Sequence, residues 1–233
     1  MTFKDRQVVV TGGTGALGIA VVGALLEAGA LCHIPYRNAE EAQRFPHRTH
    51  GGVSLVALGD LADQPSVDAF YGGFTNLWAS IHIAGGFAFA PIETSDKALL
   101  MGQIETNLVS AYLCCRAAVT AFRKAGSGGR IVNVAARHAL EPRGGSNLTA
   151  YTAAKAGVAA LSVALGEEVA RDGILVNAVA PSIMDTPANR KSMPNADYAA
   201  WPKVEQVAAT IVFLASPENA VTRSGIVPVY GTF

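Results

Sequence analysis

The sequence is short of charge, and this shortage excludes several kinds of partner. Only 15% of the 233 residues are charged, and 18 basic residues against 18 acidic ones give a formal net charge of +0. A protein that binds nucleic acid or an anionic membrane typically carries a basic excess, which this chain lacks. No apolar run approaches the ~18 residues that a membrane-spanning helix needs. We therefore expect a small-molecule substrate, with no nucleic acid and no membrane as partner.

Cysteine is scarce as well. Cys32, Cys114 and Cys115 are an odd number of thiols without metal-ligand spacing. Reduced thiols and the absence of a metal site are the simplest interpretation. The charged residues at the start of the chain lead directly into a strand-like segment, which leaves no room for a signal peptide. Together these features predict a cytoplasmic protein.

Apolar residues, by contrast, make up 50% of the chain, and strand-like segments alternate with helical ones. Strands are expected at 7–10, 31–34, 53–57, 77–84, 129–134, 174–178 and 225–229, and helices at 19–28, 95–124, 150–170 and 204–215. This alternation predicts one α/β domain of Rossmann type over residues 1–233. Its doubly wound parallel sheet of about seven strands would carry helices on both faces and bind ligands at the carboxyl ends of the strands.

A glycine-rich turn follows the first predicted strand and opens the first helix. Gly13, Gly15 and Gly18 satisfy G-x-G-x-x-G, a pattern whose backbone N–H groups hold a dinucleotide pyrophosphate when a strand precedes it and a helix follows it. The residues expected to contact the cofactor here are Gly12, Thr14, Gly15, Ala16, Leu17 and Gly18.

The end of the second predicted strand favours NADP(H) over NAD(H). An NAD site usually places an acid about 20 residues after the glycines, whereas an arginine suits the 2′-phosphate of NADP. No acid lies between Leu31 and Asn38, while Arg37 is present, and its guanidinium group matches phosphate oxygens in bidentate geometry. Tyr36 is placed to stack on the adenine.

Two further strand ends carry expected cofactor contacts. After the third strand, Asp60 either accepts a hydrogen bond from the adenine or caps the following helix, because aspartate suits both tasks; Leu61 follows it. After the fourth strand, Ala84, Gly85 and Gly86 let a ligand approach the backbone closely. Asn107, in an otherwise apolar helical segment, predicts either a bridge between backbones or part of a proton path through water.

Tyr151 and Lys155 are one helical turn apart, and thus on the same face of a predicted helix. A cation at that distance is expected to lower the pKa of the phenol from about 10, so that Tyr151 exchanges a proton near neutral pH. The alternative is an ordinary pair on a helix surface. The alanine-rich helix that carries both residues indicates close packing against another helix, and we expect this helix to come from a second subunit of a homodimer or homotetramer.

Residues 183–203 break the alternation with a polar segment that is rich in proline and also contains aromatic residues. Such a segment is typical of a lid over a ligand. Trp201 is expected against the substrate, and Pro181, Ile183 and Thr186 against the cofactor.

The glycine turn, Gly85-Gly86, Asn107, Tyr151 and Lys155 together resemble the short-chain dehydrogenase/reductases over essentially the whole chain. The resemblance implies that Tyr151 is the proton donor. It also implies that Lys155 lowers the pKa of the tyrosine and holds the nicotinamide ribose, and that Asn107 supports a water relay. In that family a serine after the fifth strand polarises the substrate carbonyl.

The serine position falls on Ala136, and its separation from Tyr151 is slightly longer than usual for the family. Ala16 also stands where the commonest form of the family has glycine. Alanine in place of the serine is similar to the dihydropteridine reductase branch. So are the segment from Asp185 to Asp197 with Trp201, and Ala84-Gly85-Gly86 followed by the aromatic Phe87. That branch differs in having an acid at the position of Tyr36 and in generally lacking Asn107.

These residues predict an NADPH-dependent oxidoreductase that transfers hydride to a reactive cyclic acceptor such as a quinonoid dihydropterin, with Ala136, Phe87 and Trp201 against the substrate. Loss of one oxyanion donor is worth about 10²–10³ in rate, which a strong hydride acceptor tolerates better than a ketone does. Two alternatives remain. One is a carbonyl reductase or alcohol dehydrogenase whose missing donor comes from Arg137, His138, Ser146 or Thr149. The other is a non-catalytic NADP-binding sensor.

Overall fold

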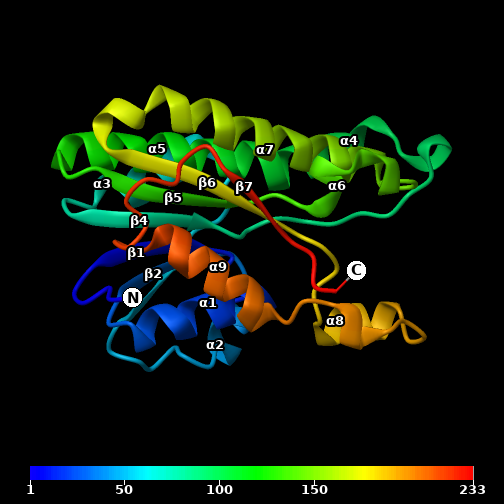
Figure 1. Cartoon of the computed structure of the whole chain (residues 1–233), viewed down its shortest axis with the longest axis horizontal. Helices are drawn as coiled ribbons and strands as arrows, with labels where there is room; N and C mark the ends of the chain where they lie inside the picture. The colour runs from blue at the N-terminus through cyan, green and yellow to red at the C-terminus, as the bar shows by residue number, and fades with distance from the viewer. Residues whose placement is uncertain (233) are drawn as a thin grey trace.

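The computed structural model describes residues 1–232, which form a single α/β domain of Rossmann type with one seven-stranded sheet (Figure 1). The strands are β1 (Gln7–Thr11), β2 (Leu31–Tyr36), β3 (Val53–Ala57), β4 (Leu77–His82), β5 (Gly129–Val134), β6 (Ile174–Pro181) and β7 (Ile226–Val229). The helices are α1 (Ala16–Glu27), α2 (Ala39–Arg44), α3 (Gln64–Gly72), α4 (Lys97–Gln103), α5 (Ser110–Ala125), α6 (Arg137–Leu140), α7 (Thr149–Glu168), α8 (Pro187–Ser192) and α9 (Val204–Ala215).

All strand pairs are parallel, and their order is β3-β2-β1-β4-β5-β6-β7. The chain therefore winds outward in one direction from β1 to β3, then crosses back to β4 and winds in the other direction. The strand order reverses between β1 and β4, which is where open α/β sheets bind their ligands. The predicted fold is confirmed, including the number of strands.

Side chains that alternate along the strands pack into two separate cores, one on each face of the sheet. Val8 and Val10 of β1 pack with α1 and α9, whereas Val9 packs with α3 and α5. Figure 1 shows the same division, with α1, α2 and α9 on one side of the sheet and α3, α5 and α7 on the other. Burial of both faces explains why the central strands are mostly apolar on both faces.

The helix predicted over 95–124 is not continuous. It begins at Lys97, passes through a π-helical segment at Ile104–Val109 and continues as α5. Asn107 lies in the π-helical segment and is buried. Such wide turns are rare and often occur at functional sites, and this one aims Asn107 at the backbone after β4.

A chain of buried hydrogen bonds joins α3 to α7 across β4 and β5. Its links are Tyr71 Oη to Ser80 Oγ (2.8 Å), Ser80 Oγ to His82 Nε2 (2.8 Å), His82 Nδ1 to Asn133 Oδ1 (2.7 Å) and Asn133 Nδ2 to Ser162 Oγ (2.9 Å). Ser162 Oγ donates in turn to the carbonyl oxygen of Val158, at 2.8 Å.

The last acceptor fixes the direction of every link. A carbonyl oxygen only accepts, so the Ser162 proton points to Val158 and Ser162 Oγ accepts from the Asn133 amide. Asn133 Oδ1 must then accept from His82 Nδ1–H, and the neutral ring accepts at Nε2 from Ser80. Burial lowers the pKa of His82 to about 4. The network is therefore complete only while His82 is neutral.

We predict that His82 makes folding stability depend on pH. Its pKa falls from 6.5 in the unfolded chain to about 4 in the folded one, so the unfolded state takes up the proton first as pH falls. This contribution to stability is fully present above pH 6.5 and is lost between pH 6.5 and about 4. The loss amounts to about 3 kcal/mol in the free energy of unfolding. Urea denaturation of the wild type and of His82→Gln across this range measures it. An equal pH dependence in both proteins would contradict the assignment.

Cys32, Cys114 and Cys115 are buried free thiols, as the sequence predicts. Among residues 1–232, no helix is long and apolar enough to cross a bilayer.

Candidate active site

A first cavity of about 450 Å³ lies where the strand order reverses, at the carboxyl ends of β1 to β4. It gathers segments that are far apart in the sequence. Its lining includes twelve of the residues predicted to hold the cofactor: Gly12, Thr14, Gly15, Ala16, Leu17, Gly18, Tyr36, Arg37, Asp60, Leu61, Ala84 and Gly85.

The glycine turn is too tight for side chains at two of its positions. Gly12 has a φ of +68°, and a Cβ there would lie 2.6 Å from the backbone nitrogen of Ala84. A Cβ on Gly18 would collide with the carbonyl oxygen of Gly12, so α1 packs directly on the turn. The first N–H groups of α1, which begins after Gly15, face this turn and provide donors for an anionic group.

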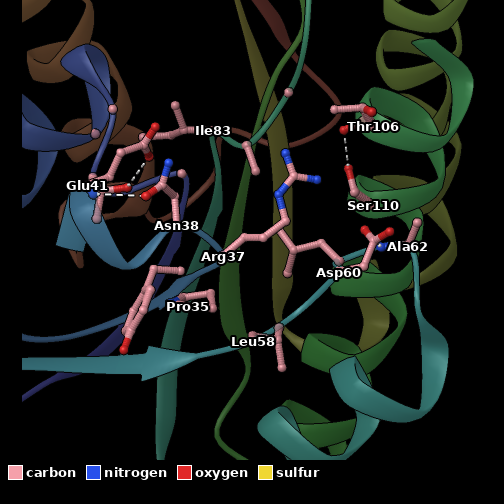
Figure 2. Close-up of a pocket in the computed structure, with 18 of the residues that line it drawn as sticks. Pro35, Arg37, Asn38, Glu41, Leu58, Asp60, Ala62, Ile83, Thr106 and Ser110 are labelled. Atoms are coloured by element: carbon pink, nitrogen blue, oxygen red, sulfur yellow. Dashed lines mark hydrogen bonds between the residues drawn. The ribbon is translucent and has the colours of Figure 1, made fainter. Parts of the chain in front are cut away.

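Arg37 and an acid that was not predicted share the cavity. Figure 2 shows the Arg37 side chain extended into the middle of the cavity, between Glu41 and Asn38 on one side and Thr106 and Ser110 on the other. Thr14 Oγ1 donates to Glu41 Oε2 at 3.3 Å, which holds the carboxylate near the glycine turn. The acid comes from α2 and not from the end of β2, so a search of the strand end alone misses it.

Asp60 does not cap the helix that follows it. Its Oδ1 accepts from the backbone N–H of Ala62 at 2.9 Å and closes a turn, while Asp63 caps α3 by accepting from Ser66. Of the two expected roles, the cap belongs to Asp63. Asp60 lines the cavity with an oxygen available to a ligand.

A second cavity of about 240 Å³ adjoins the first and opens over β4, β5 and β6. Leu17, Ile83 and Gly85 line both cavities. The other residues around the second one are Gly86, Phe87, Asn107, Val134, Ala135, Ala136, Tyr151, Lys155, Pro181, Ser182 and Met184. Its walls are mostly apolar, and the only charged side chain among them is that of Lys155.

Asn107 bridges two backbone segments. Its Nδ2 donates to the carbonyl oxygens of Gly86 (3.1 Å) and Gln103 (3.0 Å), and its Oδ1 accepts from the N–H of Gly86 (3.2 Å). This is the first of the two predicted roles, and it fixes the loop after β4. A Cβ on Gly85 would lie 2.6 Å from Asn107 Oδ1 and 3.4 Å from Lys155 Nζ, so glycine at 85 lets both side chains reach the cavity.

Tyr151 and Lys155 reach the cavity from successive turns of α7, next to β5. The Lys155 ammonium is buried and donates to the carbonyl oxygen of Val134 at 2.7 Å. The ring of Phe87 meets that of Tyr151 edge to face, with 5.1 Å between centroids. Phe87 itself is 64% exposed, and it forms an apolar rim beside the phenol.

The pKa of Tyr151 departs from the prediction. Burial raises it to about 12, and burial also lowers the pKa of Lys155 to about 8. The expected lowering of the Tyr151 pKa by Lys155 is not seen, because burial in apolar surroundings disfavours the charged phenolate and is the cause of the shift. Tyr151 therefore keeps its proton near neutral pH and is set up to donate it.

Residues 6–197 match the short chain dehydrogenase family. The chain belongs to the short-chain dehydrogenase/reductases. Together with its relatives, this membership makes the protein an NAD(P)-dependent oxidoreductase.

The relatives cover nearly the full length of the chain. It is 34% identical to cis-4-hydroxycyclohexanecarboxylate dehydrogenase of Sinomonas cyclohexanicum, over 99% of this chain and 97% of that one. In fold it is similar to a short-chain dehydrogenase/reductase of Mycobacterium ulcerans (TM-score 0.89, 22% identity, 100% of this chain and 90% of the other). It is also similar to ElxO with NADP bound (TM-score 0.87, 24% identity, 97% and 98%). These comparisons support the family, and not the dihydropteridine reductase branch in particular.

In this short-chain dehydrogenase, alanine occupies the position at which the family has its serine, so a methyl group lies in the cavity wall there. Ala136 has an extended backbone, with φ of −159°, and is 5% exposed. Arg137, His138, Ser146 and Thr149 do not line the second cavity as residues 1–232 form it. Arg137 instead pairs with Glu141 at 2.7 Å and stacks over Tyr230.

Three predicted contacts lie elsewhere in this short-chain dehydrogenase. Trp201 is buried against Tyr198, Thr186 is buried and caps α8, and Ile183 is 40% exposed. None of the three lines either cavity within the described chain. Packing of the 183–203 segment on itself removes these side chains from the walls.

Ser182 and Met184 line the second cavity although only their neighbours Pro181 and Ile183 were predicted to do so. Pro181 lines the same cavity, so the alternation of side chains in extended backbone would not have selected this set of residues.

Proposed function

We propose that this enzyme prefers NADPH and reduces a reactive small cyclic acceptor such as a quinonoid dihydropterin. The observation that carries the proposal is Ala136, which lines the same cavity as Tyr151 and puts a methyl group where the family has the serine hydroxyl. A ketone relies on oxyanion donors to accept hydride, whereas a quinonoid ring gains aromatic or conjugative stability when it is reduced. The resemblance to the dihydropteridine reductase branch supports the same substrate.

The two cavities fit a nicotinamide dinucleotide. The glycine turn and the start of α1 offer N–H donors for the pyrophosphate, Arg37 a cation for the 2′-phosphate, and the cleared space at Gly85 a route to the second cavity. The cofactor, when bound, supplies the hydride. Tyr151 donates the proton, and its raised pKa keeps that proton in place until the acceptor becomes basic.

Lys155 has a positioning and electrostatic role in this scheme. One of its three N–H donors is committed to the carbonyl oxygen of Val134, which leaves two for the ribose hydroxyls. The same cation stabilises the phenolate that forms when Tyr151 gives up its proton. Asn107 holds the loop after β4 in a fixed position beside Tyr151 and Lys155.

A second candidate is a dehydrogenase of cyclic secondary alcohols. It is favoured by the 34% identity, over nearly the whole chain, to cis-4-hydroxycyclohexanecarboxylate dehydrogenase. Among residues 1–232, Lys155 is the one charged residue in the wall of this mostly apolar cavity, which accommodates an alicyclic ring as readily as a pterin.

The two candidate functions differ in the direction of the reaction and in the reactivity of the substrate. We expect NADPH oxidation with quinonoid dihydropterin and little NADP⁺ reduction with cis-4-hydroxycyclohexanecarboxylate or cyclohexanol. The reverse result would favour the second candidate. Tight binding of NADPH with no turnover of any acceptor would favour a sensor.

Ala136→Ser provides a gain-of-function prediction. The extended backbone at 136 accepts serine, and the new hydroxyl supplies an oxyanion donor. Since a well-placed donor is worth about 10²–10³ in rate, we expect turnover of an unactivated cyclic ketone to rise about tenfold for a donor that is not otherwise optimised. Turnover of the dihydropterin should change little. Ala136→Cys, of similar size but a weak donor, is the control; an equal gain from both would show that size, not hydrogen bonding, is responsible.

We further infer that residues 183–203 act as a lid over the substrate, and that the enzyme is a cytoplasmic homodimer or homotetramer. Support for the lid is that Met184, near its start, lines the second cavity. Support for self-association is the exposure of Tyr112 on α5 (53%) and Val163 on α7 (38%).

A further inference from the structure

Ser182 is a hydroxyl in the second cavity that the mechanism above does not use. It follows β6 directly and lies in the same wall as Pro181 and Met184. The cavity contains few other polar side chains, namely those of Asn107, Tyr151 and Lys155. Each of these already has an assigned role, so the chemistry of Ser182 has to be worked out from its own contacts.

Two carbonyl groups hold Ser182 in place. Its backbone N–H donates to the carbonyl oxygen of Val229 at 3.2 Å, and its Oγ donates to the carbonyl oxygen of Tyr230 at 2.8 Å. Both acceptors follow one another in the segment that leaves the sheet at the end of β7. The side chain is thus fixed at two points, and its rotamer is set before any ligand arrives.

The contact with Tyr230 also determines whether the Ser182 hydroxyl can donate or only accept a hydrogen bond in the cavity. A carbonyl oxygen can only accept, so the single Ser182 proton points at Tyr230. Ser182 Oγ retains two lone pairs, and within residues 1–232 no N–H or O–H group donates to it. The hydroxyl is therefore an acceptor in the cavity and does not replace the donor that is missing at Ala136.

The other polar groups have the opposite character. Lys155 can only donate, and the oxygen of Asn107 already accepts from the N–H of Gly86, which leaves it one lone pair. Tyr151 holds its proton and points a donor at the acceptor atom of the substrate. Ser182 Oγ, whose two lone pairs are both free of N–H and O–H donors from residues 1–232, is thus the side-chain acceptor in this cavity with the most capacity left for a ligand N–H group.

We propose that Ser182 accepts a hydrogen bond from an amide-type N–H of the bound ligand and so orients the ring that carries it beside Tyr151. Two ligand groups have this chemistry, the carboxamide of the nicotinamide and a ring N–H or amino group of a heterocyclic substrate. The proposal rests on the cofactor occupying both cavities, and it does not require the substrate to be a pterin.

The first arm of the test uses nucleotides alone. The dissociation constants of NADP⁺ and of its 3-acetylpyridine analogue, which has a methyl ketone in place of the carboxamide, are measured on wild type, Ser182→Ala and Ser182→Thr. A neutral hydrogen bond contributes about 1 kcal/mol, so its loss weakens binding about fivefold. If the carboxamide is the donor, Ser182→Ala binds NADP⁺ about fivefold more weakly and the analogue unchanged, and Ser182→Thr restores binding.

The second arm uses substrates. If the donor is on the substrate, nucleotide binding is the same in all three proteins. The KM of Ser182→Ala then rises about fivefold for an acceptor with a ring N–H, and is unchanged for a cyclic ketone without one. Equal weakening toward NADP⁺ and the analogue, or no change in either arm, would overturn the proposal. Because the first arm needs no turnover, a wrong choice of substrate class leaves it intact.

Discussion

Replacement of Tyr151 by phenylalanine should lower kcat by about 10²–10⁴, the range lost when a positioned general acid is removed. The phenol reaches the second cavity, and burial holds its pKa at about 12, so it carries a proton at neutral pH. Phenylalanine keeps the ring that packs edge to face against Phe87. Binding of NADPH and thermal stability should therefore be almost unaffected.

Tyr198→Phe is the matched control for this experiment. The Tyr198 hydroxyl donates to the carbonyl oxygens of Arg190 and Met193, outside both cavities. Its removal should leave kcat unchanged within about threefold, since exposed loop hydrogen bonds contribute little. A wild-type kcat in Tyr151→Phe would show that Tyr151 is not the proton donor and that another group supplies the proton.

Replacement of Arg37 by glutamate should reverse the preference between NADPH and NADH. The guanidinium group extends into the first cavity, where a 2′-phosphate would accept two charge-assisted hydrogen bonds (Figure 2). Loss of these bonds, with a new negative charge in their place, should reduce kcat/KM for NADPH by about 100-fold or more. The value for NADH should change by less than about threefold, because the ribose hydroxyl tolerates an acid.

Glu41→Gln tests the same phosphate site by removing a negative charge. Glu41 lines the first cavity and is held by Thr14, so its carboxylate opposes a bound phosphate. Its neutral replacement should strengthen NADPH binding severalfold and leave NADH binding nearly unchanged. If Arg37→Glu leaves the cofactor preference as it was, Arg37 does not contact the phosphate.

The fold was largely predictable because the chain alternates two clear periodicities. β3, β5 and α9 were predicted with the bounds that the structure has, since each is a mostly apolar segment of clear periodicity. The differences between the predicted and the observed elements lie where local hydrogen bonding departs from the regular pattern. The strand β2 continues through Pro35, which still pairs in register with Val56, although proline is rare inside strands. The π-helical segment around Asn107 has no signature in the apolar pattern at all.

Most of the lining of the first cavity was predictable for a related reason. Its residues follow strand ends directly, and the carboxyl ends of parallel strands meet at one edge. Glu41 was missed because it reaches the cavity from α2, whereas Trp201 lies outside the lining of both cavities because the 183–203 segment packs on itself. The pKa of Tyr151 depends on how deeply the ring is buried, and the spacing of Tyr151 and Lys155 does not reveal that depth.

The central claim is that a hydride acceptor lies between Tyr151 and the methyl group of Ala136. A crystal structure of the full chain with NADP⁺ and an unreactive dihydropterin analogue tests it most directly. We predict the nicotinamide in the second cavity, the analogue within hydrogen-bond distance of the Tyr151 hydroxyl, and only apolar contact at Ala136. A nicotinamide outside that cavity, or a side chain other than Tyr151 on the reacting edge of the analogue, would contradict the claim.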